Sequence, residues 1–210
     1  ATNLYISKDV ETSTITIPTE VTYKNVTYPV VSVGKTNVSN ESSLFFGSLE
    51  PNTTVSFAQK DGKTSITKIN AYAFCGCTNI QSVNIPDSVT EIGDYAFYNC
   101  NLIKSVNIPK NVTVIGENAF YNCGKISSFT IPYGLKELGK NAFGQCTGAT
   151  FTIENPNFAK DNLTNTGITY VTGYDNSTAR EYYVKSVMPT LDDGIKESRW
   201  VSLDGTTKAD

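Results

Sequence analysis

Apolar and polar residues alternate in a pentapeptide that recurs every 23 residues. It reads SVNIP at 82–86 and 105–109, and SFTIP at 128–132. Alternation with a period of two indicates a strand with one buried face, and the proline ends the strand because it removes a backbone donor. We predict adjacent parallel strands at 80–85, 103–108 and 126–131, with Val83, Val106 and Phe129 buried.

Other positions keep the same period. Two ladders are Phe74, Phe97, Phe120 and Phe143, and Cys77, Cys100, Cys123 and Cys146. A second apolar pattern, VTEIG, VTVIG and LKELG, predicts another short strand that a glycine closes. The segment xxAFxxC that follows predicts a helical or 3₁₀ turn. A self-similar period between about 20 and 50 residues is typical of a stacked solenoid, in which each coil buries its apolar ladder against the next.

The complete unit, I-P-x-x-V-x-x-I-G-x-x-A-F-x-x-C, returns three to four times at fixed spacing over about residues 65–155. It resembles the BspA-like leucine-rich repeat, also called the Treponema pallidum type. The resemblance implies a right-handed solenoid with a parallel sheet on its concave side. It also implies a bacterial protein that is secreted or anchored at the cell surface and that adheres to or binds proteins rather than catalysing a reaction.

The expected fold is therefore β-rich α/β, a right-handed leucine-rich-repeat solenoid of 23-residue coils with a parallel sheet, capped at both ends. We expect one domain over 1–210. Its parts are an N-terminal cap with a hairpin at 1–34, an irregular coil with insertions at 35–65, regular repeats at 66–155 and a C-terminal cap at 156–210. We predict that NVSNES at 37–42 and KDGKT at 60–64 are the loops inserted into the irregular coil.

Local patterns predict the structure of the two ends. VTYKNVTY indicates a hairpin that turns at Lys24 and Asn25. Near the C-terminus, ITYVTGY and RWVSLD indicate strands, and a helix is expected to begin near Ser177 or Thr178. The insertion VMPTLDDGIKE between them departs from the closing segment of BspA-like domains, so its course stays open.

Composition limits the chemistry. The chain has no histidine, a net charge of −3 and no run of Lys or Arg, which argues against His-dependent catalysis, nucleic-acid binding and binding to anionic membranes. Nor does any stretch approach 18 consecutive apolar residues, so we expect no membrane insertion. Glu91, Asp94, Glu117 and Glu137 are the candidate carboxylates for a glycosidase. They alternate with Val114 and Lys140 in other coils, as solvated positions do, and we predict no catalytic site.

We predict neither a metal site nor a cofactor. Asp192, Asp193 and Gly194 lack the regular spacing of a calcium loop, and the C-x-C pair of Cys75 and Cys77 is weak evidence for a metal. The four ladder cysteines are expected to be buried thiols that pack the turn, although stacked cysteines are close enough for a disulfide and this alternative stays open.

Two surfaces could bind a partner. The outward positions of the predicted sheet carry small or polar side chains: Ser82, Ser105 and Ser128; Asn84, Asn107 and Thr130; Gln81, Lys104 and Ser127. A second surface is a stripe formed by Tyr98 and Tyr121, with Tyr72 and Tyr95 nearby, because tyrosine is a frequent interface anchor. The sheet positions could instead be a solvated strand face, and the tyrosines could pack on one another.

The favoured function is a secreted or cell-surface binding module, adhesin-like, that recognises an extracellular protein, a glycan or a host-matrix component. The alternative is a structural spacer that displays other parts of a larger surface protein. We expect an extracellular or cell-surface location after removal of a signal peptide. A capped array has few exposed sheet edges, which predicts a monomer.

Overall fold

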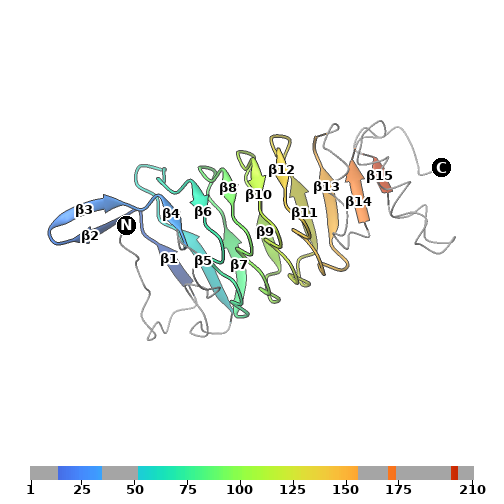
Figure 1. The fold of residues 1–210 in the computed structure, drawn as a ribbon, viewed down its shortest axis with the longest axis horizontal. Helices are drawn as coiled ribbons and strands as arrows, with labels where there is room; N and C mark the ends of the chain where they lie inside the picture. Colours follow the sequence, from blue (N-terminus) through green and yellow to red (C-terminus); the bar gives the residue numbers. More distant parts are fainter. Residues whose placement is uncertain (1–13, 35–51, 156–169, 174–199, 203–210) are drawn as a thin grey trace.

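The computed structural model describes residues 14–34, 52–155, 170–173 and 200–202. Strands joined by turns make up this part of the chain, and none of it is helical. Successive repeats lie side by side along one axis (Figure 1). The helical component of the expected α/β class is therefore wrong for the described residues. The helix expected near Ser177 and the insertion 187–197 lie outside them.

The longer strands form two four-stranded sheets that adjoin end to end, and we call them together the main sheet. Neighbouring strands within each of the two are parallel. Its members are β1 (Thr14–Ile17), β5 (Thr53–Phe57), β7 (Ile80–Asn84), β9 (Ser105–Asn107), β11 (Ser128–Ile131), β13 (Thr150–Ile153), β14 (Tyr170–Gly173) and β15 (Trp200–Ser202). β7 and β9 pair in the register that the 23-residue period predicts, with Val83 opposite Val106. β9 and β11 are neighbours without a hydrogen-bonded ladder between them (Figure 1). The predicted strands and their order are confirmed, but their bounds are shorter.

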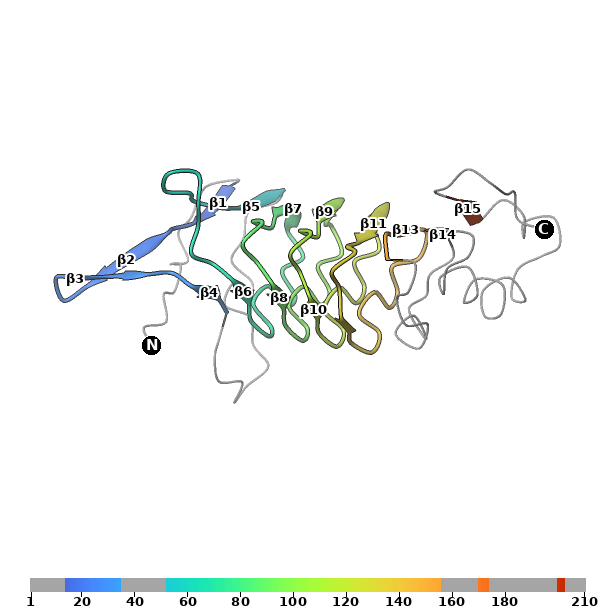
Figure 2. The same ribbon diagram turned by 90° about the horizontal axis from the view of Figure 1, so that it is seen from above.

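Five strands of two residues each form the second sheet. They are β4 (Ser32–Val33), β6 (Lys68–Ile69), β8 (Glu91–Ile92), β10 (Val114–Ile115) and β12 (Glu137–Leu138), and neighbouring strands are parallel. β8, β10 and β12 are the second strands predicted from the VTEIG, VTVIG and LKELG patterns. Seen from above, the two sheets occupy different sides of the stack (Figure 2).

The segment between the second sheet and the ladder cysteine is neither helical nor 3₁₀, so that prediction was wrong. We call it the AF turn, and its copies span 71–77, 94–100, 117–123 and 140–146. Alternate N–H groups do close i→i−3 bonds, as in Cys77 N–H to Phe74 C=O at 3.1 Å. The N–H groups between them donate to the next repeat, as in Phe74 N–H to Ala96 C=O at 2.7 Å. A helix would keep all of these bonds within one segment.

The core lies between the two sheets and the AF turns. The phenylalanine ladder is fully buried, and the rings of Phe74, Phe97 and Phe120 stack with centroids 5.1 Å apart. Val83, Val106 and Phe129 are buried from the main sheet as predicted, together with Phe151 and Ile153 of β13.

The hairpin at the N-terminal end is confirmed. β2 (Glu20–Tyr23) and β3 (Val26–Pro29) are antiparallel, and the turn residues Lys24 and Asn25 have φ of 48° and 61°. The predicted loop at 60–64 is a tight turn in which Lys60 and Lys63 exchange backbone bonds. The residues 37–42 of the other predicted insertion lie outside the described part.

Candidate binding surfaces

Two rows of polar side chains cross the outward face of the main sheet. The side chains of a strand alternate between faces, so each buried apolar position is flanked by two outward ones. The first polar row is Thr14, Thr54, Ser82, Ser105, Ser128 and Thr150, and the second polar row is Thr16, Ser56, Asn84, Asn107, Thr130 and Thr152. Neighbouring strands lie about 4.8 Å apart, so each row presents a polar group at every repeat.

The rows extend beyond the predicted residues at both ends. The strand β1 contributes Thr14 and Thr16, and β13 contributes Thr150 and Thr152. The alternating pattern in TITIP and TFTI was the available signal. TITIP was assigned to the N-terminal cap, and TFTI was assigned to the regular repeats without being counted among the candidate contacts. The outward face is therefore longer than the sequence predicted.

Most of the predicted site residues in these rows are available to a partner. Asn84, Ser105, Asn107, Ser128 and Thr130 are exposed, and their side chains make no hydrogen bond within the described part of the chain. They offer amide and hydroxyl donors and acceptors in regular order.

Toward the N-terminal end the polar groups bond to one another. Ser82 is half-buried, and its hydroxyl bonds to the hydroxyl of Thr54 at 3.1 Å. The hydroxyls of Thr16 and Ser56 are 3.0 Å apart. Ser82 is thus a weaker candidate contact than the sequence suggested, because a partner would have to replace an existing bond.

Charge is scarce on this face. Neither polar row contains an ionisable residue. Lys104 lies in the adjoining ladder, is exposed and forms no ion pair with a described residue. In the same ladder the Gln81 side chain donates to Asn52 Oδ1. Lys104 therefore supplies the positive charge in the predicted set.

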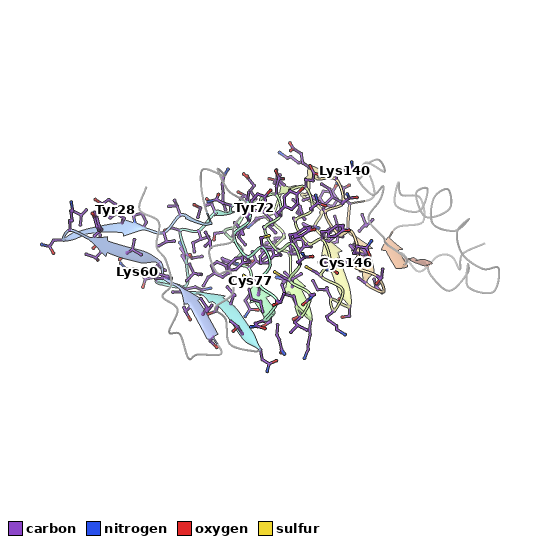
Figure 3. All side chains as sticks on the ribbon, turned by 60° about the horizontal axis from the view of Figure 1, so that its bottom comes forward. Tyr28, Lys60, Tyr72, Cys77, Lys140 and Cys146 are labelled. Atoms are coloured by element: carbon purple, nitrogen blue, oxygen red, sulfur yellow. The ribbon has the colours of Figure 1, made fainter. Side chains whose placement is uncertain are left out.

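The tyrosine stripe is a packed column rather than an open platform. The rings of Tyr72 and Tyr95 stack at 4.9 Å, those of Tyr95 and Tyr98 are tilted at 5.4 Å, and those of Tyr98 and Tyr121 stack at 5.2 Å. Tyr121 also rests on Gly144, where an added Cβ would come 2.7 Å from its ring. All four tyrosines are half-buried (Tyr72 is labelled in Figure 3). Since every ring of the column packs against at least one neighbouring ring, less of the ring faces is available to a partner.

The carboxylates considered for catalysis have separate surroundings. Glu91 forms an ion pair with Lys68 at 2.5 Å on the second sheet, and Asp94 Oδ1 accepts the N–H of Glu117 at 2.7 Å. Glu137 is exposed on β12. Among the described residues, no group of three or more His, Cys, Asp or Glu could hold a metal ion, and there is no long apolar helix that could cross a membrane. Asp192 and Asp193 lie outside the described part.

All five cysteines lie in the described part of the chain and are present as thiols. The Sγ atoms of Cys100, Cys123 and Cys146 donate to the carbonyl of the phenylalanine 26 residues earlier, at 3.0, 3.3 and 3.1 Å. Burial raises the pKa of Cys100 and Cys123 well above the ordinary value and that of Cys146 to about 12. These thiols are protonated at neutral pH, which makes them poor nucleophiles.

The profile described as BspA type leucine rich repeat region matches residues 52–167 in six copies. The chain belongs to this family. The match extends the repeats beyond the 65–155 expected from the motif alone. No curated protein sequence matches the chain significantly.

Three solved structures are similar to parts of this BspA-type chain. A leucine-rich repeat protein of T. pallidum is 23% identical with a TM-score of 0.40, over 50% of this chain and 58% of that one. A leucine rich cell surface protein from Faecalibacterium prausnitzii A2-165 is 23% identical with a TM-score of 0.41, over 68% of this chain and 48% of that one. A leucine-rich repeat protein from Bacteroides ovatus ATCC 8483 is 21% identical with a TM-score of 0.36, over 75% and 47%. The chain spans about half the length of these relatives.

Proposed function

We propose that this BspA-type chain is a secreted or cell-surface binding module, adhesin-like, that recognises an extracellular protein or host-matrix component through the polar rows. The observation that carries the proposal is the run of exposed side chains at Asn84, Ser105, Asn107, Ser128 and Thr130 without hydrogen bonds of their own among the described residues. A partner with matching donors and acceptors gains bonds there without breaking existing ones.

The architecture that we propose is a right-handed solenoid over 1–210 whose ends, 1–34 and 156–210, act as caps. The stacked ladders support it, since each repeat bonds to its neighbours through the sheets and the AF turns. Family membership supports a place outside the cell. In this proposal the chain carries no catalytic site, and the tyrosine stripe stabilises the stack rather than binding the partner.

The test is a charge substitution on the second polar row. Asn84, Asn107 and Thr130 are changed together to Glu, which places like charges about 5 Å apart on the proposed surface. Binding to a panel of immobilised extracellular-matrix proteins should be lost, because a partner cannot desolvate three adjacent carboxylates. Folding should survive, since all three side chains are exposed.

A matched control adds the same charge elsewhere. Thr78, Asn101 and Thr147 follow ladder cysteines and are exposed, and changing them to Glu should leave binding intact. If the two triple variants bind equally well, the polar rows are not the site. Failure of the unsubstituted protein to bind any member of the panel would favour the spacer function, and loss of binding only when Tyr98 and Tyr121 become Ser would place the site on the stripe.

A further inference from the structure

The hairpin of β2 and β3 projects from the end of the stack (Figures 1 and 2). Its turn has two residues, so the closing pair, Tyr23 and Val26, exchanges both backbone bonds. Bonded and non-bonded pairs alternate along antiparallel strands. The bond from Val30 N–H to Thr19 C=O at 2.8 Å fits this alternation. The backbone groups of Thr22 therefore point away from β3.

The two edges of the hairpin differ. On β2 the outward backbone groups belong to Glu20 and Thr22, and on β3 they belong to Thr27 and Pro29. Pro29 has no N–H, which blunts the edge of β3. The edge of β2 keeps two donors and two acceptors, and no described residue outside the hairpin bonds to them. It is the edge that can accept another strand.

The hairpin is also more apolar than a solvated ribbon. Val21, Tyr23, Val26 and Tyr28 share one face, and the last three are exposed by 50, 49 and 45%. An isolated two-stranded hairpin is at best marginally stable in water, and additional strands are what stabilise such a ribbon.

We propose that the hairpin pairs with the hairpin of a second copy of this chain, β2 against β2, antiparallel about a twofold axis. In this register Glu20 lies opposite Thr22 of the second copy, and all four outward groups of each β2 find partners. Val21 meets its own counterpart on the axis. The result is a four-stranded sheet that ends on both sides at a proline-blunted β3, so that association stops at two copies.

Charged residues favour this register of the two β2 strands and favour a second copy of this chain as the partner. The antiparallel arrangement brings the turn residue Lys24 of one copy diagonally across from Glu20 of the other, within reach of long side chains. The Nζ of Lys24 lies over its own Tyr23 ring, 5.3 Å from the ring centroid, and in the dimer it would exchange this contact for the carboxylate. Lys60 binds Glu20 through Oε1 at 2.8 Å, and Oε2 has no ion-pair partner in the described part of the chain. Sliding the strands until Glu20 faces Glu20 would place like charges together. The expectation of a monomer considered the ends of the array and not this edge.

A crosslink tests the register directly. In a Cys75→Ala background, Val21→Cys puts two thiols at a non-bonded pair with Cα atoms about 4.5 Å apart, which is within disulfide range. Mild oxidation should convert most of the protein to a covalent dimer on a non-reducing gel. The control, Tyr28→Cys, lies on the same face but one strand away from the axis and should remain largely monomeric. Equal crosslinking of the two variants, or none in either, would overturn the proposal.

Sedimentation tests the edge. The unsubstituted protein should show a concentration-dependent mass between monomer and dimer, and Thr22→Pro should weaken dimerisation by about tenfold or more because it removes a bonding N–H from each copy. Thr27→Pro makes the same change on the other edge and should leave the dimer intact. Lys24→Glu should weaken it, whereas Lys125→Glu, an exposed residue of a distant repeat, should not.

Two outcomes contradict the proposal. One is a monomer at concentrations on the order of 100 µM, including the case in which the β2 edge instead captures an extended segment of another protein. The other is a dimer that Thr22→Pro and Thr27→Pro weaken equally. Dimerisation and partner binding are independent here, because the polar rows lie on the main sheet and not on the hairpin.

Discussion

Each ladder cysteine in the middle of the stack ties one repeat to the previous one. The thiol of Cys123 is fully buried and donates to Phe97 C=O at 3.3 Å, a carbonyl that also accepts the N–H of Cys100. Cysteine suits this position because it is small and apolar and yet carries a weak donor. Cysteine thus recurs every 23 residues for two reasons. Its thiol bonds to the previous repeat, and its small apolar side chain fits the buried position.

The burial of the thiols determines how fast they react with a thiol reagent and how the free energy of unfolding depends on pH. A thiol reagent at about pH 8 should leave the four ladder cysteines of the folded protein unmodified and react with all five cysteines after denaturation. Cys146 has its pKa raised from 9.0 to about 12 by burial, so the folded protein keeps a proton that the unfolded chain releases. The free energy of unfolding should therefore fall as pH rises through that window, and less steeply in Cys146→Ala. Rapid labelling of the native ladder would contradict this account.

A second residue-scale feature is the pair of left-handed positions in every AF turn. The later position is Gly76, Asn99, Asn122 and Gln145, with φ of 72°, 59°, 57° and 60°. Glycine and asparagine adopt this conformation most readily, and other residues are strained there.

Gln145→Asn should therefore stabilise the protein by roughly 0.5 kcal/mol, since it relieves strain at an exposed site. Gln145→Val should destabilise it, because a β-branched side chain tolerates positive φ poorly. Urea unfolding followed by circular dichroism measures both changes. An Asn variant that is less stable than the original would show that the Gln side chain contributes more than its backbone strain costs.

At the scale of elements, glycines set how closely the repeats approach. An added Cβ at Gly116 would lie 2.5 Å from Asp94 N, and one at Gly139 would lie 2.2 Å from Glu117 N. These obstacles are backbone atoms, which cannot move aside without shifting a whole repeat. Glycine follows four of the five strands of the second sheet, whereas Asn70 follows β6. At Gly116 and Gly139 the glycine therefore permits close stacking as well as a turn.

Gly116→Ala should destabilise the fold by about 1–3 kcal/mol or more, because the alanine methyl forces neighbouring repeats apart. Gly124→Ala provides the control, since its Cβ would meet only Gln145 O at 3.6 Å, an ordinary contact. Thermal unfolding of the two variants measures the difference. Similar midpoint temperatures of thermal unfolding in the two variants would mean that the repeats can shift at Gly116 without a loss of stability.

The elements also show what a sequence can and cannot predict here. The strands at Val83, Val106 and Phe129 were predictable because burial imposes a period of two within each segment. The AF turn was misjudged because its local bonds, such as Ala73 N–H to Asn70 C=O at 3.3 Å, resemble a helical turn, whereas its other bonds depend on the next repeat. The sequence of one turn does not show that its N–H groups bond to carbonyl groups 22 residues later in the chain.

The position of the outward face of the main sheet was predictable from the sequence, but its hydrogen bonds were not. Period and alternation located Asn84, Asn107 and Thr130 on the outward side. The bond between Ser82 and Thr54 depends on a register shift between β5 and β7 beside Thr53, where the sequence departs from the repeat. The sequence likewise left open whether the tyrosines anchor a partner or pack on one another, because that depends on the positions of the rings.

For the molecule as a whole, the proposed binding surface on the polar rows is almost uncharged, in a chain with a net charge of −3. Coulombic attraction therefore contributes little to either the affinity or the encounter rate. Binding at this face depends on hydrogen bonds and shape, which salt screens weakly.

Partner affinity should accordingly change by less than about threefold between low and high salt, whereas a site built on several ion pairs would lose far more. Lys104→Ala should alter the association rate more than the dissociation rate, because an exposed charge at the rim chiefly steers encounter. Biosensor measurements over a salt series check both expectations. A steep decline in affinity with salt would place the contact on another, charged part of the surface.

The ladders run in opposite senses: AF-turn N–H groups donate forward to the next repeat, as Tyr95 does to Glu117, and second-sheet N–H groups donate backward, as Gly116 does to Ile92. At the AF turns and the second sheet, each regular repeat therefore meets both neighbours with the same set of backbone groups. Removing one such repeat would leave the same backbone bonds available at the new junction. At the level of the gene, unequal crossing-over between the segments that encode neighbouring repeats adds or deletes whole coils without creating a new interface. The length of such a protein can therefore change by whole repeats while the contacts between neighbouring repeats stay the same.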